Sequence, residues 1–427
     1  MIRLRLVSSL LLAAAGFAPL ARAAGDALAN GFYTRGVEMA AYMDQGSPVG
    51  DPFYIPAPTG ALLPRVTLTV THEDNVFLDP GEKTEGTSVR LVPGVLGLWG
   101  RPADNHVYVD YGVSIPVYDS APDVDDNPAH MLKLGVVYRT GKSQVQGQVG
   151  YHRQEDLDVV AGARLAKQDY LADLSLEHRI SGKSSLGLVG RAERHDFEAD
   201  RYLDYDRYYG AGRLYHRATA KSEVFAQGGI GRDDPLRDSD ARNGADFYDL
   251  SLGVRGKQSP KFHTTGRVGY MWRAYDDPER ADAGDWIAAL TAESSPFGLA
   301  TFRGELYADI RPAIDAHGVD TVDQGGTLSV ERRLFIERLR GNASLTAGRV
   351  EYSGSPHADE NEWVRDGRTD NYWGFSVGVD WWTRQRFSVG LAYSYMRRDG
   401  SRGAGAEAED ATSYDYGRWT LRASWNY

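Results

Sequence analysis

The sequence predicts an all-β protein, a transmembrane antiparallel β-barrel of about 18 strands (16–18) with short periplasmic turns and long external loops. Three observations support this fold class. Apolar and polar residues alternate along most of the chain, the connections between the alternating segments are short and long in turn, and the chain ends on an alternating aromatic segment.

Period-two alternation is clearest at the C-terminal end. The apolar row consists of Trp419, Leu421, Ala423, Trp425 and Tyr427, and the residues between them are polar. Such alternation gives a β-strand one apolar and one polar face. A final strand with tryptophans in its apolar row is typical of a barrel that faces lipid on the outside and water on the inside.

Segments of about ten to fifteen residues repeat this pattern from Pro64 onward, the first beginning near Val66 and the last near Tyr416. In the segment from Trp373 to Trp381, apolar residues alternate with Gly374, Ser376, Gly378 and Asp380. Polar groups of this kind are costly to bury without partners, so the second face is expected to line a hydrated lumen.

The linkers sort by length. Short ones such as Thr140–Lys142 and Ser181–Lys183 interleave with long ones such as Asp119–Ala129 and Tyr352–Arg368. Bacterial barrels show short periplasmic turns and long external loops in this way. An even number of strands also brings the last strand beside the first, which removes the free sheet edges.

The N-terminal residues predict export. Residues 1–23 have a basic start, an apolar stretch from Leu6 to Leu20 and a small-x-small cleavage pattern at Ala21–Ala23, as in a signal peptide. Residues 24–63 are rich in proline and glycine and are expected to form an irregular periplasmic segment. Residues 64–427 form the predicted outer-membrane barrel, which places the protein in a bacterial outer membrane.

Composition excludes several functions. The chain has no cysteine, so it has no disulfide or thiolate chemistry. Its net charge of −11 makes nucleic acid an improbable partner. The triplets Gly141–Ser143 and Gly182–Ser184 lack the first glycine of a phosphate-binding loop and are interpreted as turns. The ten histidines lie in no nucleophile motif. We therefore expect no enzyme, no cofactor and no metal site, and we interpret the acidic runs in long linkers as solvated loop charge.

In an alternating strand, the odd or even position of a residue predicts whether it faces the lumen or the lipid. This gives two sets of candidate residues. The pore-lining candidates are Arg139, Arg191, Arg255, Arg267, Arg273, Arg303, Arg311, Arg386, Arg418 and Arg422. The membrane-girdle aromatics are Trp373, Trp381, Phe387, Tyr393, Tyr395, Trp419, Trp425 and Tyr427. Inward arginines favour anions in a pore. The alternative is a ladder of Arg–carboxylate pairs that only fills the barrel, and the sequence leaves both open.

The segment from His72 to Gly100 resembles the opening hairpin of a family of outer-membrane β-barrel porins (beta-barrel porin type 2-like proteins). The matching residues are Asp74, Asn75, Val76, Phe77, Pro93, Gly94 and Val95, and the tyrosine-rich strand around Tyr208 and the closing segment are also similar. The resemblance covers roughly residues 64–427. It implies an association with exopolysaccharide export systems and provides no catalytic residues.

The predicted function is a passive outer-membrane channel for an anionic polysaccharide or oligosaccharide. One alternative is a general diffusion porin for small solutes, and a second is a barrel-borne surface enzyme or adhesin. The expected partners are outer-membrane lipid and lipopolysaccharide, the barrel-assembly machinery acting on the C-terminal strand, and a periplasmic polysaccharide-export component.

Overall fold

The computed structural model describes residues 55–57, 60–78, 83–100, 105–119, 127–158, 163–198, 204–236, 244–259, 261–278, 281–296, 300–312, 320–336, 338–352, 369–384, 387–401 and 413–426. The predicted signal peptide, most of the predicted N-terminal segment, Arg386, Tyr427 and the acidic runs at 123–126 and 407–410 lie outside them. Within the described residues there is no helix with the length and apolarity needed to cross a membrane.

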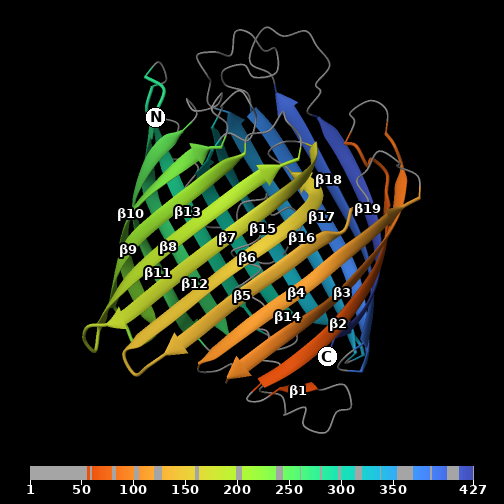
Figure 1. Ribbon diagram of the computed structural model, residues 1–427, viewed down its shortest axis with the longest axis horizontal. Coiled ribbons are helices and arrows are strands. Elements are labelled where there is room, and N and C mark those ends of the chain that lie inside the picture. The colour runs from red at the N-terminus through yellow and green to blue at the C-terminus, as the bar shows by residue number, and fades with distance from the viewer. Residues whose placement is uncertain are drawn as a thin grey trace.

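Eighteen antiparallel strands, β2 to β19, form a closed barrel (Figure 1), as the alternation predicts. The strands are β2 Gly60–Glu73, β3 Gly86–Gly100, β4 His106–Tyr118, β5 Ala129–Arg139, β6 Ser143–Asp158, β7 Ala163–Arg179, β8 Ser184–Phe197, β9 Tyr205–Arg217, β10 Ser222–Pro235, β11 Ala245–Ser259, β12 Phe262–Tyr275, β13 Ala283–Ser294, β14 Ala300–Arg311, β15 Thr321–Arg333, β16 Leu339–Tyr352, β17 Thr369–Arg384, β18 Phe387–Ser401 and β19 Tyr414–Asn426. A short additional strand, β1 (Ile55–Ala57), pairs with the start of β2.

The two ends of the barrel differ as the linker lengths predict. The short turns and the end of β19 lie at the lower end in Figure 1, which is the periplasmic end, and the strand ends that precede and follow the longer connections lie at the upper, external end. Two boundaries differ from expectation. The first barrel strand begins at Gly60 instead of Pro64, because Ala61 and Leu63 are buried against Leu96 and Trp425. Strands β6 and β7 continue their pairing to Asp158 and Ala163, so the segment from Asp156 to Lys167, whose length and charge also predict a long linker, is largely hairpin.

The outward face is apolar, as expected of a wall in contact with lipid. Leu174, Leu250 and Val377 expose large parts of their side chains on it. Outward aromatics form two bands, one near the external end that includes Trp373 and Trp419, and one near the periplasmic end that includes Trp381. Trp373 and Trp381 are eight positions apart on one tilted strand, which spans roughly 20 Å of membrane height. This agrees with the apolar band of outer-membrane barrels.

The seam between the first and last strands is held beyond its ladder of hydrogen bonds. The ladder runs from Arg418↔Glu73 to Asn426↔Arg65. Past its external end, the Asp74 N–H donates to the Gly417 carbonyl over 3.1 Å, and the Gly417 N–H donates to Asp74 Oδ1 over 2.6 Å. The buried Asn75 amide donates to the Asp415 carbonyl at 3.1 Å. Two residues of the porin-like Asp-Asn-Val-Phe segment therefore fasten the closed barrel.

Candidate luminal site

The external half of the lumen contains a cluster of buried charges. The Arg273 guanidinium lies 2.7 Å from Asp233 and 2.8 Å from Asp320, and Arg207 lies 3.0 Å from Asp233. The Tyr275 hydroxyl donates to Asp320 at 2.5 Å. Because the Arg273 side chain is 0% exposed, it offers no surface to a solute. This cluster supports the wall and does not line an open path.

A second buried cluster lies on β14 to β18. Arg311 contacts Asp323 at 3.0 Å, and the Tyr372 hydroxyl donates to the same carboxylate at 3.2 Å. Arg398 pairs closely with Asp370 and donates to the Tyr352 hydroxyl at 2.7 Å. These residues form the Arg–carboxylate filler that the sequence left open as an alternative. In the external half, that alternative describes most of the contacts.

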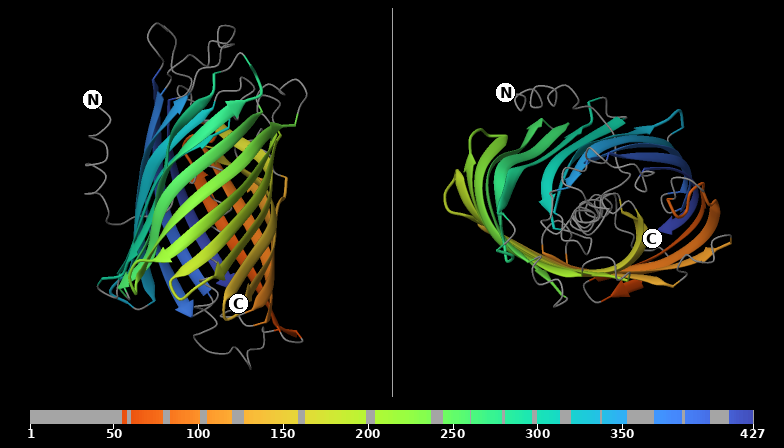
Figure 2. Two further views of the ribbon diagram at one scale, coloured as in Figure 1. Left: turned by 90° about the vertical axis from the view of Figure 1, so that its left-hand side faces the viewer. Right: turned by 90° about the horizontal axis from the view of Figure 1, so that it is seen from above.

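The wall also steps inward between β13 and β14. Their pairing runs only from Ala288↔Ala308 to Ser294↔Phe302. Ile310, beyond that pairing, is buried against Phe247, Met271 and Ile287, which lie on the lumen face of β11 to β13. The external ends of β14 and β15 therefore lean into the barrel, as the view from above in Figure 2 shows. This narrows the external half of the lumen.

The periplasmic half presents a different surface, which we call the arginine–hydroxyl surface. It borders a cavity of about 420 Å³ on the inner face of β14 to β19. Its polar lining consists of Thr301, Arg303, Ser329, Glu331, Asn342, Ser376, Asp380, Ser394, Arg418, Thr420 and Arg422. Guanidinium and hydroxyl donors thus lie side by side on adjacent strands.

Two of the three arginines of this surface, Arg303 and Arg422, remain accessible, whereas Arg418 is half-buried. Arg303 lies 3.1 Å from Glu293, and Arg422 lies 2.7 Å from Asp380, yet their side chains are 45% and 50% exposed. Arg418 lies over the Tyr416 ring, 5.9 Å from its centroid. An exposed ion pair contributes little to stability and keeps donors free for a solute.

Small hydroxyl side chains form the floor between the arginines. Ser344 and Ser376 are joined by a hydrogen bond of 2.6 Å, and Ser394 donates to the Arg418 carbonyl at 3.5 Å. Their short side chains leave room above the strand, and a hydroxyl can both donate and accept. Such a floor suits repeated hydrogen bonding to the hydroxyl groups of a sugar.

The structure places the other arginine candidates as follows. Arg191 pairs with Asp173 at 2.8 Å, and Arg255 pairs with Glu177 at 2.8 Å while lying 3.8 Å from the Tyr215 ring centroid. Arg267 lies on the lumen face of β12, and Arg139 ends β5 at the periplasmic rim. Their pore-lining role stays a prediction. Of the girdle candidates, Trp373, Trp381, Phe387 and Trp419 are exposed on the outward face, where Trp373 contacts Tyr395 and Tyr393 contacts Trp419. Trp425 is partly buried against Ala61 and Leu63, and Tyr427 lies outside the described residues.

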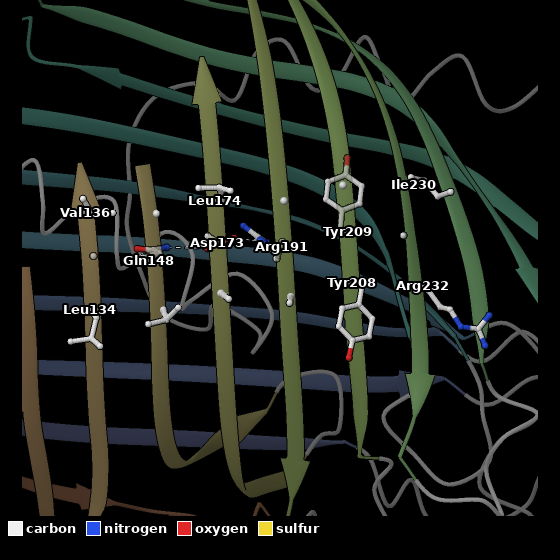
Figure 3. A pocket seen from close by; sticks show the side chains of 18 of the residues that line it. Leu134, Val136, Gln148, Asp173, Leu174, Arg191, Tyr208, Tyr209, Ile230 and Arg232 are labelled. Carbon is white, nitrogen blue, oxygen red and sulfur yellow. Dashed lines mark hydrogen bonds and ion pairs between the residues drawn. The ribbon is translucent and has the colours of Figure 1, made fainter. Parts of the chain in front are cut away.

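Another hollow, of about 920 Å³, lies on the outer wall (Figure 3). Leu134, Val136, Leu174 and Ile230 border it, and all four belong to the lipid-facing rows of β5, β7 and β10. Lumen-facing Asp173, which pairs with Arg191 in the figure, contributes only where its strand passes beneath the hollow. We therefore assign this hollow to the membrane surface and not to the channel.

Sequence reasoning identified the inward arginines and some of their inward partners, such as Asp173 and Asp380, but not all of them. Asp233 belongs to one of the acidic runs interpreted above as solvated loop charge, whereas the structure buries it on β10. Asp320 and Tyr372 were not singled out. The sequence indicates only that these residues lie near a strand end at positions that face inward. Many other residues share that property, so it does not single these out. The part of the chain that the structure describes holds no group of three His, Asp or Glu side chains suited to a metal ion.

A model of the family described as putative beta-barrel porin 2 matches residues 51–413. Among solved structures, the chain is similar to OccK10 (OpdN) of Pseudomonas aeruginosa, with 12% identity, coverage of 87% of this chain and 99% of that one, and a TM-score of 0.43. It is also similar to OccAB4 of Acinetobacter baumannii, with 14% identity, coverage of 86% and 98%, and a TM-score of 0.45. A third similar structure is that of OccK2 (OpdF) of Pseudomonas aeruginosa in complex with glucuronate, with 11% identity, coverage of 86% of this chain and 98% of that one, and a TM-score of 0.46. No curated protein matches.

Proposed function

The chain belongs to the putative beta-barrel porin 2 family and forms an outer-membrane porin channel, and we propose that this channel passes an anionic polysaccharide or oligosaccharide. Transport is passive and needs no cofactor in this proposal. A polymer made in the cell would leave through the barrel, driven by its synthesis or by a periplasmic export component.

The arginine–hydroxyl surface carries this proposal. Arg303, Arg418 and Arg422 lie on β14 and β19, on opposite sides of a floor of serine and threonine hydroxyls. Guanidinium groups bind carboxylate or sulfate in a forked geometry. The hydroxyls between them offer the short, exchangeable hydrogen bonds that let a sugar chain move without being trapped.

Exposure separates these arginines from those that only fill the barrel. Arg273 is fully buried between carboxylates, whereas Arg303 and Arg422 expose about half of their side chains. The Glu293 partner is as exposed as Arg303, so an anion can displace it at little cost. It cannot reach a buried pair.

The second candidate function is a general diffusion porin for small solutes. The carboxylates of Glu293, Glu331 and Asp380 stand among the same arginines. A lumen with both signs of charge discriminates weakly among small solutes. The third alternative, a surface enzyme or adhesin, predicts no conductance.

The test is conductance in planar bilayers with added polymer. We expect wild-type channels to favour Cl⁻ over K⁺ in reversal-potential measurements and to be blocked by polygalacturonate but not by neutral dextran of the same length. In the variant Arg303→Ala/Arg418→Ala/Arg422→Ala, block by polygalacturonate falls by roughly ten-fold or more, because each lost charge-assisted contact contributes about 1.5–3 kcal/mol.

The matched control removes two exposed arginines from the outer wall, Arg349→Gln/Arg397→Gln, which pair with Glu351 and Asp399. It should leave both selectivity and block unchanged. Equal block by dextran and polygalacturonate would favour the general porin. Block that persists in the triple variant would overturn the role of the arginine–hydroxyl surface, and an absence of conductance would overturn the channel.

A further inference from the structure

Four consecutive periplasmic turns repeat one local arrangement. Each has a serine or threonine two residues before an exposed lysine, and the hydroxyl oxygen accepts the backbone N–H of that lysine. The pairs are Thr140 with Lys142 at 3.3 Å, Ser181 with Lys183 at 3.2 Å, Thr219 with Lys221 at 3.1 Å, and Ser259 with Lys261 at 3.2 Å. The two Gly-Lys-Ser triplets of the sequence are two of these four turns.

The arrangement fixes the backbone of each turn at the lysine. In the first turn, the Thr140 N–H also donates to the Ser143 carbonyl at 2.7 Å, and the Ser143 N–H donates to Thr140 Oγ1 at 2.9 Å. Hydroxyl-closed turns of this kind hold a short loop in one conformation. The lysine is therefore presented from a fixed base on an exposed turn; the Lys261 ammonium also donates to the Pro296 carbonyl at 3.0 Å.

These lysines form a row along the rim. The turns join β5 to β6, β7 to β8, β9 to β10 and β11 to β12, which are neighbours in the sheet (Figure 1). Two strands separate successive turns, so the lysines recur about every 10 Å. We call Lys142, Lys183, Lys221 and Lys261 the lysine row.

The rim around the row is basic although the whole chain carries a net charge of −11. Arg179, Arg217 and Lys257 are exposed at the same end of the strands. At the external end, the exposed Asp276 and Asp399 pair with Arg232 and Arg397. The contrast between the two ends therefore rests on the exposed cations of the periplasmic mouth.

A cavity connects the lysine row to the lumen. It has a volume of about 390 Å³ and includes one carboxylate, Glu223 of β10, which pairs with Arg217 at 3.6 Å and with Arg255 at 2.8 Å. Its other charged or titratable lining residues are Lys221 of the row, Arg217, Arg255, Lys257 and His263. Except for Lys221, these residues lie on the lumen-facing rows of β9, β11 and β12. The basic surface thus continues from the turn tips into the barrel and does not end at the membrane edge.

We propose that the lysine row is a capture site for the anionic polymer at the periplasmic mouth. This proposal rests on the proposed function. A row of cations at a regular spacing matches a chain of repeating carboxylates, and several weak contacts along one polymer add up to firm binding. Continuity with the lumen favours the transported polymer over an acidic protein or a lipid headgroup, since neither would need cations inside the mouth. The row gives the channel a preferred side of entry.

The experiment measures polymer block from each side of a bilayer. The protein is the full chain carrying Phe335→Cys, which adds the only thiol at a fully exposed residue in a different periplasmic turn. Block by a thiol-reactive polyethylene glycol too large to cross the channel then reports which side is periplasmic. Neutral zwitterionic bilayers remove anionic lipid as a competitor.

We expect polygalacturonate at low salt to block at least roughly ten-fold faster from the periplasmic side than from the external side, the smallest effect typical of electrostatic steering. The variant Lys142→Gln/Lys183→Gln/Lys221→Gln/Lys261→Gln should lose this preference. The variant with arginine at the same four positions should keep it. High salt should abolish it in every protein, because screening shortens the reach of the charges.

Three results would overturn the proposal: equal block from both sides in the wild type, a side preference that survives in the glutamine variant, or its loss in the arginine variant. The first two are expected if the row binds lipid phosphate or an acidic protein. Each of these leaves the proposed function intact as long as block occurs. If polygalacturonate blocks from neither side, the proposed function fails, and the capture site fails with it.

Discussion

Arg273 of β12 and Asp233 of β10 form an ion pair of 2.7 Å in which the side chains are 0% and 3% exposed. Parity correctly places Arg273 on the inner face, yet the side chain is closed off from any solute. The contact is an ion pair without a well-formed hydrogen bond, because the Arg273 nitrogens and the Asp233 oxygens are close but poorly aligned for one. Burial of this kind makes the pair a structural element whose removal should affect stability more than transport.

Replacing Arg273 by Met should therefore lower stability by about 3–5 kcal/mol, because Asp233 and Asp320 would be left buried with less positive charge. The temperature at which the folded band disappears in unheated-versus-heated gel electrophoresis measures this. The double variant Arg273→Met/Asp233→Asn should be less destabilised than the sum of its single variants. Additive losses, or a change in ion selectivity with unchanged stability, would contradict a structural role.

Two neighbouring residues of β17 test which side faces lipid. Val377 lies outward, 49% exposed and midway between Trp373 and Trp381, whereas Ser376 lies inward beside Ser344. Val377→Arg should cost about 2–4 kcal/mol, as expected for arginine at the bilayer midplane. Ser376→Arg should cost about 0.5–1.5 kcal/mol, the value of one hydrogen bond. Urea titration of folding into lipid vesicles measures both, and equal losses would argue against the membrane orientation.

The seam offers a third test. Asp74→Ala removes the acceptor for the Gly417 N–H and should cost about 1–3 kcal/mol, because that donor is left without its partner. Asp74→Asn retains a side-chain carbonyl and should recover much of the loss. The gel-mobility assay applies here too. A seam role predicts faster loss of the folded band in Asp74→Ala, so a folded band as persistent as in the wild type would exclude it.

Lys83 gives a prediction for pH. Its ammonium donates to Asp415 Oδ2 at 2.6 Å across the external seam, and that hydrogen bond raises the pKa of Lys83. The pair therefore stabilises the fold fully below the unfolded lysine pKa of roughly 10.4. This contribution is lost as pH rises through the higher folded pKa. Because both side chains are well exposed, it is less than about 1 kcal/mol.

The comparison is between wild type and Lys83→Met at pH 8 and pH 11, with the unfolding temperature as the readout. The wild type should be the more stable protein at pH 8, and the difference should shrink at pH 11. Lys221→Met, which removes an exposed lysine from a periplasmic turn, is the control and should show no such pH-dependent difference. A gap between wild type and Lys83→Met that widens with pH would contradict the assigned pairing.

Much of the wall could be predicted because β-structure repeats every two residues. The alternation of Trp419, Leu421 and Ala423 with Thr420 and Arg422 is enough to fix one strand and its two faces. Linker lengths then order the strands and orient the ends. The start of β2 at Gly60 and the external ends of β6 and β7 were predicted wrongly. Proline near the first and acidic residues near the second predict loops, but pairing with a neighbouring strand overrides such local preferences.

The sequence by itself determined that apolar and polar residues alternate, that the strands number about 18, and that arginines such as Arg273 and Arg422 face inward. Only the tertiary structure decided that Arg273 is enclosed by carboxylates while Arg422 remains exposed on a hydroxyl-lined floor. The physical reason is that the direction in which a side chain points, inward or outward, follows from the two-residue period of its own strand. Exposure depends on which residues the register sets beside a side chain and on where the wall bends inward, as it does at Ile310.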